Sequence, residues 1–249
     1  ITLTGQLTIR WAEYALNSYL NRVLKNSEWK DYIVAIDTDS LYVCLDDLVQ
    51  KVQPNNTIDF LDKVCQDALE PELEKSYADL YNMLGGVDNR MVMKREAIAD
   101  RALWTAKKRY IMNVHDNEGV RYAEPKLKIM GIEAIKSSTP APCREALKKI
   151  FHVIMKEDES SVQQAIEQFK NYFKTLEPDE IAFPRGVTQV RKWQDRNTLY
   201  KKGTPIHVRG SILYNKLVED MQLKKKYEPI NNGEKIKFLY LRQPNSIHE

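Results

Sequence analysis

The stretch YIVAIDTDSLYVCL at residues 32–45 decides how this chain should fold. It contains two short apolar runs, 32–36 and 41–45, on either side of the acidic and hydroxyl residues 37–40. Apolar runs of about four to eight residues joined by a short polar segment are typical of a β-hairpin. We therefore predict two antiparallel strands here, with the acidic residues at the turn.

The two acids of this turn, Asp37 and Asp39, are candidate catalytic and metal-binding residues. Side chains two positions apart at a strand end project to the same side, so the two carboxylates should stand together. Two negative charges so close are costly unless a cation lies beside them, and Mg²⁺ binds a few carboxylates together with substrate phosphates. Two such ions in phosphoryl transfer activate the attacking hydroxyl and neutralise the leaving pyrophosphate.

This acidic pattern alone leaves other interpretations open. Exposed acidic turns are common, and a sugar-nucleotide transferase also uses an acidic metal motif. A calcium loop of the EF-hand type does not fit, because this sequence lacks the glycine that such a loop needs at its sixth position and the glutamate that closes it.

The apolar spacing outside the hairpin predicts further elements. Helices are expected at 8–25 and 58–84, and Pro71 should kink or break the second one. The same analysis predicts strands at 90–99, 108–115, 120–123 and 127–135.

Beyond about residue 132 the pattern becomes mostly helical. A helix should begin near Pro140, and another should follow a capping box formed by Ser160 and Gln163. Residues 178–211 are expected to form a basic loop, followed by a late strand at 235–241. The predicted fold is α/β (α+β), with an antiparallel sheet and packed helices before a mostly helical part.

The composition limits the function. The chain has 249 residues, of which 43% are hydrophobic, enough for one large domain or two modest ones. No apolar run approaches the roughly 20 residues of a membrane span, so no membrane partner and a cytoplasmic location are expected. The three scattered cysteines should be free thiols in a reducing compartment, with no disulfide framework or zinc site: Cys44, Cys65 and Cys143.

The net charge of +3 hides a segregated pattern. Residues 46–100 carry 6 Lys/Arg against 12 Asp/Glu, whereas 101–150 carry 11 against 5 and 191–249 carry 13 against 6. Such segregation suits a protein that grips a polyanion with some surfaces and not with others. Solvated helix faces are the alternative explanation.

Several segments resemble, in order and spacing, motifs of the family B (alpha-like) DNA polymerases of large tailed phages. The sequence IDTDSLY at 36–42 resembles the third palm motif, and KKRY at 107–110 resembles the primer-binding motif. Three further segments resemble the family. Residues 95–98 resemble the strand before the primer-binding motif, 126–131 with 137–140 resemble the palm-to-thumb passage, and 205–210 resemble a thumb segment. The resemblance covers nearly the whole chain.

This resemblance implies two domains. Residues 1–132 would be a partial palm domain that carries the Asp-Thr-Asp hairpin, and 133–249 would be a C-terminally truncated thumb. The implied reaction is two-metal nucleotidyl transfer that extends a DNA primer, with deoxynucleoside triphosphate as the substrate and primer-template DNA as the partner.

The resemblance also assigns roles around the acidic turn. Asp39 would be a direct ligand of the catalytic Mg²⁺ ions, two of them in the complete enzyme, and Asp37 would act at the same site. Thr38, Ser40 and Glu96 would be neighbours of the site. Close relatives carry an acid where this chain has Lys94, which makes the local field less negative here.

The primer-binding motif gives the first set of DNA-binding residues, Lys107, Lys108, Arg109 and Tyr110. Strand alternation would place Lys108 and Tyr110 on one face, so these two should reach the DNA. Lysines release counterions from phosphate, which adds affinity without sequence preference. The turn should therefore aim Asp39 into an open cleft beside Lys108 and Tyr110.

A second basic set lies in the thumb-like part and would hold the duplex backbone. Trp193 and Tyr200 interleave with these charges, and we expect them to pack the thumb rather than stack on bases. The candidate DNA-binding residues of this set are Lys192, Arg196, Lys201, Lys202 and Arg209, with Arg191 beside them.

The other motifs of the family are not found in residues 1–249: the second metal-binding Asp, the fingers helix and the exonuclease carboxylates. We therefore expect a C-terminal part that is inactive alone and needs an N-terminal polymerase portion. A sliding clamp would bind only through a tail absent here, and a phage-encoded protein would act in the host cytoplasm. One alternative is a duplex-DNA-binding subunit or remnant of a split polymerase without chemistry, and another is a nucleotide-sugar transferase. A reverse-transcriptase-like palm is the third, but its two acids are adjacent in sequence.

Overall fold

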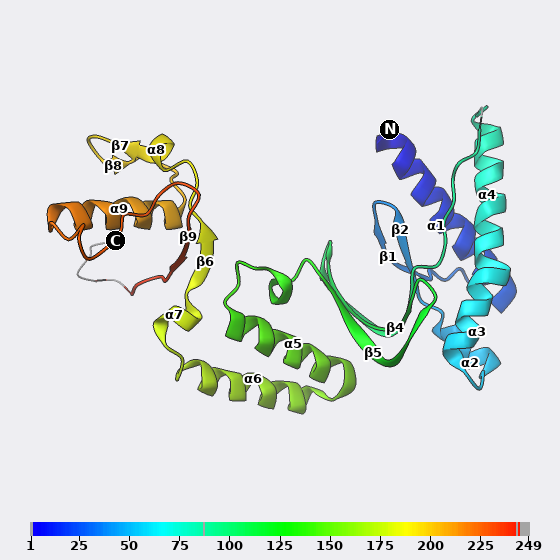
Figure 1. The fold of residues 1–249 in the computed structure, drawn as a ribbon. Helices are drawn as coiled ribbons and strands as arrows, with labels where there is room; N and C mark the ends of the chain where they lie inside the picture. The colour runs from blue at the N-terminus through cyan, green and yellow to red at the C-terminus, as the bar shows by residue number, and fades with distance from the viewer. Residues whose placement is uncertain (1, 87, 243, 245–249) are drawn as a thin grey trace. The chain divides into compact units, whose positions relative to one another are not determined.

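The computed structural model describes residues 2–86, 88–242 and 244, and its contacts divide the chain into two units, Ile1–Met130 and Gly131–Glu249 (Figure 1). Helices and antiparallel strands occur in both units, which confirms the predicted mixed fold class. No helix within the described ranges is long and apolar enough to cross a bilayer. Cys44, Cys65 and Cys143 are free thiols, as expected.

The predicted hairpin of the first unit forms from β1 (Ile33–Asp37) and β2 (Ser40–Val43). The strands pair antiparallel, and Asp37 lies opposite Ser40. Thr38 and Asp39 are consequently the two residues of the turn. Thr38 has a φ of 35°, in the left-handed region that such tight turns require.

Helix α1 (Thr2–Leu24) begins six residues before the predicted start at residue 8. Its buried positions start only at Thr8 and Ile9. The apolar spacing therefore marked the packed part of the helix and missed its exposed first turns.

The predicted helix at 58–84 is present without the break expected at Pro71. It consists of α3 (Thr57–Val64), the π-helical turn η1 (Cys65–Leu69) and α4 (Glu70–Met83), and a separate short helix, α2 (Asp46–Val52), precedes it. Pro71 lies in the first turn of α4, where its missing N–H is tolerated. The wider turn before it, in which the Glu70 N–H donates to the Cys65 carbonyl, continues the helical path.

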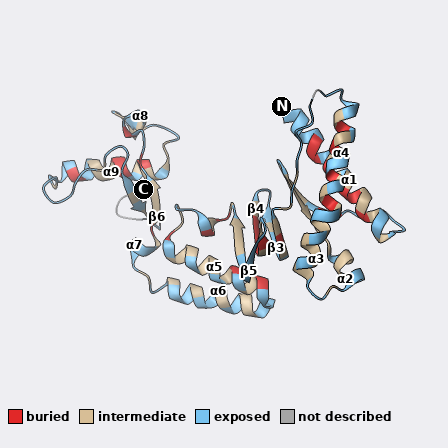
Figure 2. Ribbon diagram, turned by 45° about the vertical axis from the view of Figure 1, so that its right-hand side comes forward, coloured by how far each residue is buried: buried red, intermediate tan, exposed pale blue. Residues whose placement is uncertain are grey.

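The main core of this unit lies between α1, α4 and the hairpin. Leu16 and Leu20 of α1 pack with Leu73 and Tyr77 of α4, and Tyr32 before β1 joins them. Figure 2 shows the buried residues of α1 and α4 where the two helices run side by side. This packing fixes the base of the acidic hairpin on a rigid support.

A three-stranded antiparallel sheet completes the unit, in the order β3 (Ala97–Ala106), β4 (Arg109–Asn117), β5 (Val120–Met130). The predicted strand at 90–99 is wrong for most of its length, since regular structure begins only at Ala97. The strands predicted at 120–123 and 127–135 are one strand, β5. It is an edge strand, where Pro125 is tolerated because no ladder hydrogen bond is needed there.

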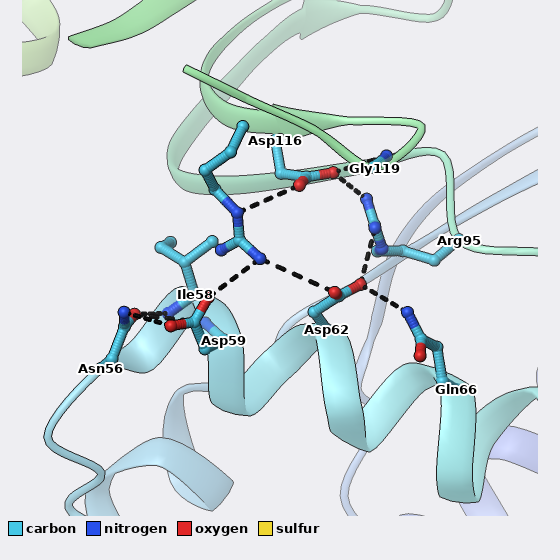
Figure 3. A network of polar contacts seen from close by, with 9 residues as sticks. Asn56, Ile58, Asp59, Asp62, Gln66, Arg95, Asp116 and Gly119 are labelled. Carbon is cyan, nitrogen blue, oxygen red and sulfur yellow. Dashed lines mark hydrogen bonds and ion pairs between the residues drawn. The ribbon is translucent and has the colours of Figure 1, made fainter. Parts of the chain in front are cut away.

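A network of two arginines and three aspartates joins the sheet to α3 (Figure 3). Arg95 lies between Asp62 of α3, at 2.6 Å, and Asp116 of β4, which is only 1% exposed. Arg121 of β5 contacts Asp116 at 3.2 Å and Asp59 at 3.0 Å. Burial lowers the pKa of Arg95, but its hydrogen bonds to Asp116 and Asp62 outweigh this and raise the pKa above its ordinary value.

In the second unit, the short turn η2 (Glu133–Ile135) leads to the neighbouring helices α5 (Ala141–Lys156) and α6 (Glu159–Phe173). The predicted helices are confirmed, but the cap of α6 was wrong. Asp158, not Ser160, accepts a hydrogen bond from the Ser161 N–H, because a carboxylate at this position meets both the free N–H and the positive helix end.

The region 178–211, predicted to be a loop, contains regular structure. Five short elements come first: α7 (Pro178–Ile181), β6 (Phe183–Gly186), α8 (Val190–Trp193), and β7 (Gln194–Asp195) with β8 (Leu199–Tyr200), which form a hairpin. Helix α9 (Ile206–Asp220) follows, and β9 (Lys235–Phe238) pairs with β6. Val187, Val190, Val208 and Ile212 form the core of this part.

Candidate active site

The two acids of the hairpin lie in different surroundings. Asp37 is the last residue of β1 and accepts a hydrogen bond from the Thr38 hydroxyl at 3.1 Å. Asp39 lies in the turn itself and is exposed, with the Ser40 hydroxyl 3.5 Å from its carboxylate. The strand alternation that was expected to align the two side chains does not extend to Asp39, because the strand ends at Asp37.

Lys108 of the KKRY segment reaches this hairpin. Its ammonium nitrogen Nζ lies 3.1 Å from Oδ1 of Asp37, and the two side chains are 61% and 31% exposed. The hydrogen bond from Lys108 is the main cause that lowers the pKa of Asp37, and Thr38 and Lys107 add to it. The fold thus brings the basic turn and the acidic turn together, with Asp37 as the acid that is paired.

The expected alternation of Lys108 with Tyr110 is wrong, although Arg109 and Tyr110 do lie in a strand, β4. Lys107 and Lys108 form the turn between β3 and β4, and Lys108 has a φ of 61°, so alternation cannot place it on the same face as Tyr110. Tyr110 is only 6% exposed. It packs against other rings, and Arg109 beside it is half-buried.

A pocket of about 270 Å³ lies between the two turns. Its wall is formed by β1, including Asp37, by the rings of Tyr42, Trp104 and Tyr110, and by Lys107 with Lys108. Burial raises the pKa of Tyr42, and its hydrogen bond with Tyr110 and the charges of Glu96 and Asp37 raise it further. Tyr42 therefore keeps its proton at any working pH and acts as a neutral hydrogen-bonding wall.

Glu96 lies close enough to Tyr42 to influence its ionisation, but its carboxylate is engaged by Lys128 of β5. Lys94 is exposed. Glu96 was expected to lie next to the acidic turn, and its influence on Tyr42 is the observation that supports this.

The donor set fits a hard divalent cation in part. Carboxylate oxygens are the ligands that Mg²⁺ prefers, and the exposed Asp39 is accessible to an ion. Yet no three His, Cys, Asp or Glu side chains gather in a metal-binding group anywhere in the described part of the chain. An ion at this turn would need further oxygen ligands from substrate, water or residues beyond those described.

The chain is similar in sequence to the DNA polymerases of two phages. The chain is 35% identical over 259 aligned residues to the DNA-directed DNA polymerase of Enterobacteria phage T4, and 36% identical over the same length to that of Escherichia phage RB69. Each alignment covers 98% of this chain. The chain is related to these phage DNA polymerases.

The relationship concerns one part of those phage polymerases. The chain spans 28% of the length of each relative. No protein-family model matches it.

The second basic set lies on and around the β7–β8 hairpin. Lys192, Arg196, Lys201 and Lys202 are exposed there. Asp195 is held inside the turn, where N–H groups of Thr198 and Asn197 lower its pKa. The solvent-facing charge of this hairpin is consequently mostly positive.

The aromatic residues among these charges pack inward, as predicted. Trp193 and Tyr200 contact the core around Val190 and Val208. Lys192 lies 5.1 Å from the Trp193 ring centroid, and the half-buried Arg209 lies 4.8 Å from that of Tyr200. Each ring therefore packs on the core and also contacts a basic side chain.

The sequence did not predict two features of the structure. One is the Arg95–Asp116 network, whose members are scattered along the sequence. The other is the ring cluster of Tyr42, Trp104 and Tyr110. A signal for the cluster was present, because Trp104 lies three residues before the Lys-Lys turn and Tyr110 two residues after it.

Proposed function

We propose that these residues form part of a DNA-directed DNA polymerase that extends a primer by two-metal nucleotidyl transfer. The observation that carries the proposal is the contact of Lys108 with Asp37, which joins the basic turn to the acidic turn. The similarity to the phage T4 and RB69 enzymes over 98% of the chain supports it.

Asp39 is the proposed direct ligand of the metal. Its carboxylate is exposed at the tip of the hairpin, whereas the carboxylate of Asp37 is engaged by Lys108. Mg²⁺ bound there would lower the pKa of the primer 3′-hydroxyl and stabilise the charge that develops on the leaving pyrophosphate. Asp37 then acts beside the ion and fixes the position of Lys108.

Primer-template DNA is the proposed partner of both basic surfaces. Lys107 and Lys108 project from a tight turn next to the acids, where they meet the end of the primer. The β7–β8 hairpin supplies charges for backbone contacts, which give affinity without reading sequence. Deoxynucleoside triphosphate is the second substrate.

The described residues supply only part of a two-metal site, because no third carboxylate joins Asp37 and Asp39 in a metal-binding group among them. Octahedral Mg²⁺ needs six oxygen ligands, and two ions need a shared set. We therefore propose that these 249 residues are inactive alone and act together with the remaining polymerase portion.

Primer extension by complementation tests the proposal. The 249-residue chain is mixed with a polypeptide that carries the remaining polymerase motifs, together with a labelled primer-template, Mg²⁺ and nucleotides. Extension should require both polypeptides. Duplex binding without extension would favour the binding-subunit alternative, and binding of a nucleotide sugar without affinity for primer-template would replace the proposal by a transferase.

A further inference from the structure

Three aromatic rings connect the acidic hairpin to the basic turn. Tyr42 of β2 contacts Trp104 of β3 at 5.2 Å between ring centroids and Tyr110 of β4 at 5.4 Å, with interplanar angles of 75° and 64°. Trp104 and Tyr110 are cross-strand partners 5.9 Å apart. Edge-to-face contacts of this kind are favoured because the positive edge of one ring meets the negative face of another.

The position of Trp104 gives it influence over the turn. Beyond the Trp104–Tyr110 pair the register is irregular, and only Ala106 and Arg109 pair before Lys107 and Lys108. Ala106 has too small a side chain to anchor the turn. The Thr105 hydroxyl donates a further hydrogen bond to the Arg109 carbonyl, at 3.2 Å.

Lys108 depends on this support. Its φ of 61° lies in a region that non-glycine residues seldom adopt, so the surrounding contacts must hold it there. On the other side, Tyr42 lies opposite Ala35 in the hairpin ladder, close to the end of β1 at Asp37. The ring cluster therefore fixes the distance between the Lys108 turn and Asp37.

We propose that Trp104 is a positioning residue that holds the Lys107–Lys108 turn against the acidic hairpin, so that Lys108 is preorganised for primer-template DNA. This inference rests on the proposed function, since it assumes that the turn meets DNA. A preorganised lysine binds phosphate or a groove edge with less loss of conformational entropy than a lysine on a mobile turn. Trp104 contributes through Lys108 and needs no contact of its own with DNA.

A double-mutant cycle on primer-template affinity tests this inference. The dissociation constant of the 249-residue chain is measured at several salt concentrations for the wild type, Trp104→Leu, Lys108→Ala and the double variant. Each single variant should weaken binding by about tenfold and flatten the salt dependence by about one charge. The double variant should bind no more weakly than Lys108→Ala alone.

Two further variants separate positioning from general damage. Trp104→Phe retains a ring for the edge contacts and should recover most of the affinity. Trp29→Leu makes the same change at another tryptophan, which stacks on Tyr14 at 6.0 Å, and should leave DNA binding unchanged. Thermal unfolding of each variant reports its folding.

The outcomes are distinct. Additive losses in the double variant, normal binding by Trp104→Leu, or an equal loss in Trp29→Leu would overturn the role of Trp104. In each of these cases salt-dependent binding by the wild type, weakened in Lys108→Ala, leaves the proposed function standing. A wild-type chain without salt-dependent affinity for primer-template would overturn both.

Discussion

At the scale of single residues, the chemistry of the site depends on how two turns share their charges. The sequence singles out the acids and the lysines as candidate site residues, because their chemical types and order are visible in the chain. It could not predict that Lys108 pairs with Asp37, since that contact depends on the left-handed backbone at Lys108 and on the close approach of two hairpins.

The pKa of Asp37 reports this contact directly. Lys108 holds that pKa below its ordinary value, so Lys108→Met should raise it, as measured by NMR titration of the carboxyl carbon. A depressed carboxyl pKa stabilises the folded state at pH values above the unfolded pKa. Lys108→Met should therefore be less stable than the wild type at neutral pH, and this difference in stability should disappear as the pH falls through the folded pKa of Asp37.

Lys107→Met is the matched control for this titration. Lys107 contributes the smallest of the shifts that lower the pKa of Asp37, so its removal should raise the pKa less. An unchanged pKa in Lys108→Met would show that the ion pair does not form in solution.

At the scale of elements, periodicity predicted those whose packed face is regular. Helix α6 and the acidic hairpin were recognised because their apolar residues recur at the expected spacing. Helix α9 was missed because its start at Ile206 follows Pro205, and Gly210 interrupts the pattern that its buried residues Val208 and Ile212 begin. The prediction divided β5 into two strands on either side of Pro125. A proline is tolerated within this strand because β5 lies at the edge of the sheet.

The charged network between α3 and the sheet was beyond prediction, since its members come from separate elements and only the fold brings them together. Arg95→Met should destabilise the protein by about 3 kcal/mol, because it leaves the buried carboxylate of Asp116 with Arg121 as its remaining cation. Urea unfolding monitored by circular dichroism measures this change.

Arg90→Met serves as the control for Arg95→Met. Arg90 pairs with Asp88 at the surface and is 87% exposed, so its loss should change stability by less than about 0.5 kcal/mol. Equal effects of the two substitutions would mean that the network does not hold the sheet to α3.

At the scale of the whole molecule, charge segregation and motif order in the sequence indicate a protein that acts on nucleic acid. Identity of 35–36% with the two phage polymerases over nearly the whole chain agrees with that indication. What no sequence pattern could supply is the placement of the parts around a shared site: the ring cluster, the turn that carries Lys108 and the rings beneath the basic β7–β8 hairpin all depend on tertiary packing.

We propose that the exposed carboxylate of Asp39, at the tip of the β1–β2 hairpin, holds a catalytic metal. The most direct test of this proposal is the rate of primer extension by the complemented enzyme carrying Asp39→Asn, with Asp79→Asn on the exposed side of α4 as the control. Asp39→Asn should reduce the rate of extension at least about a hundredfold with unchanged primer-template affinity, and the control should keep the wild-type rate. Extension at the wild-type rate by Asp39→Asn would show that Asp39 holds no catalytic metal.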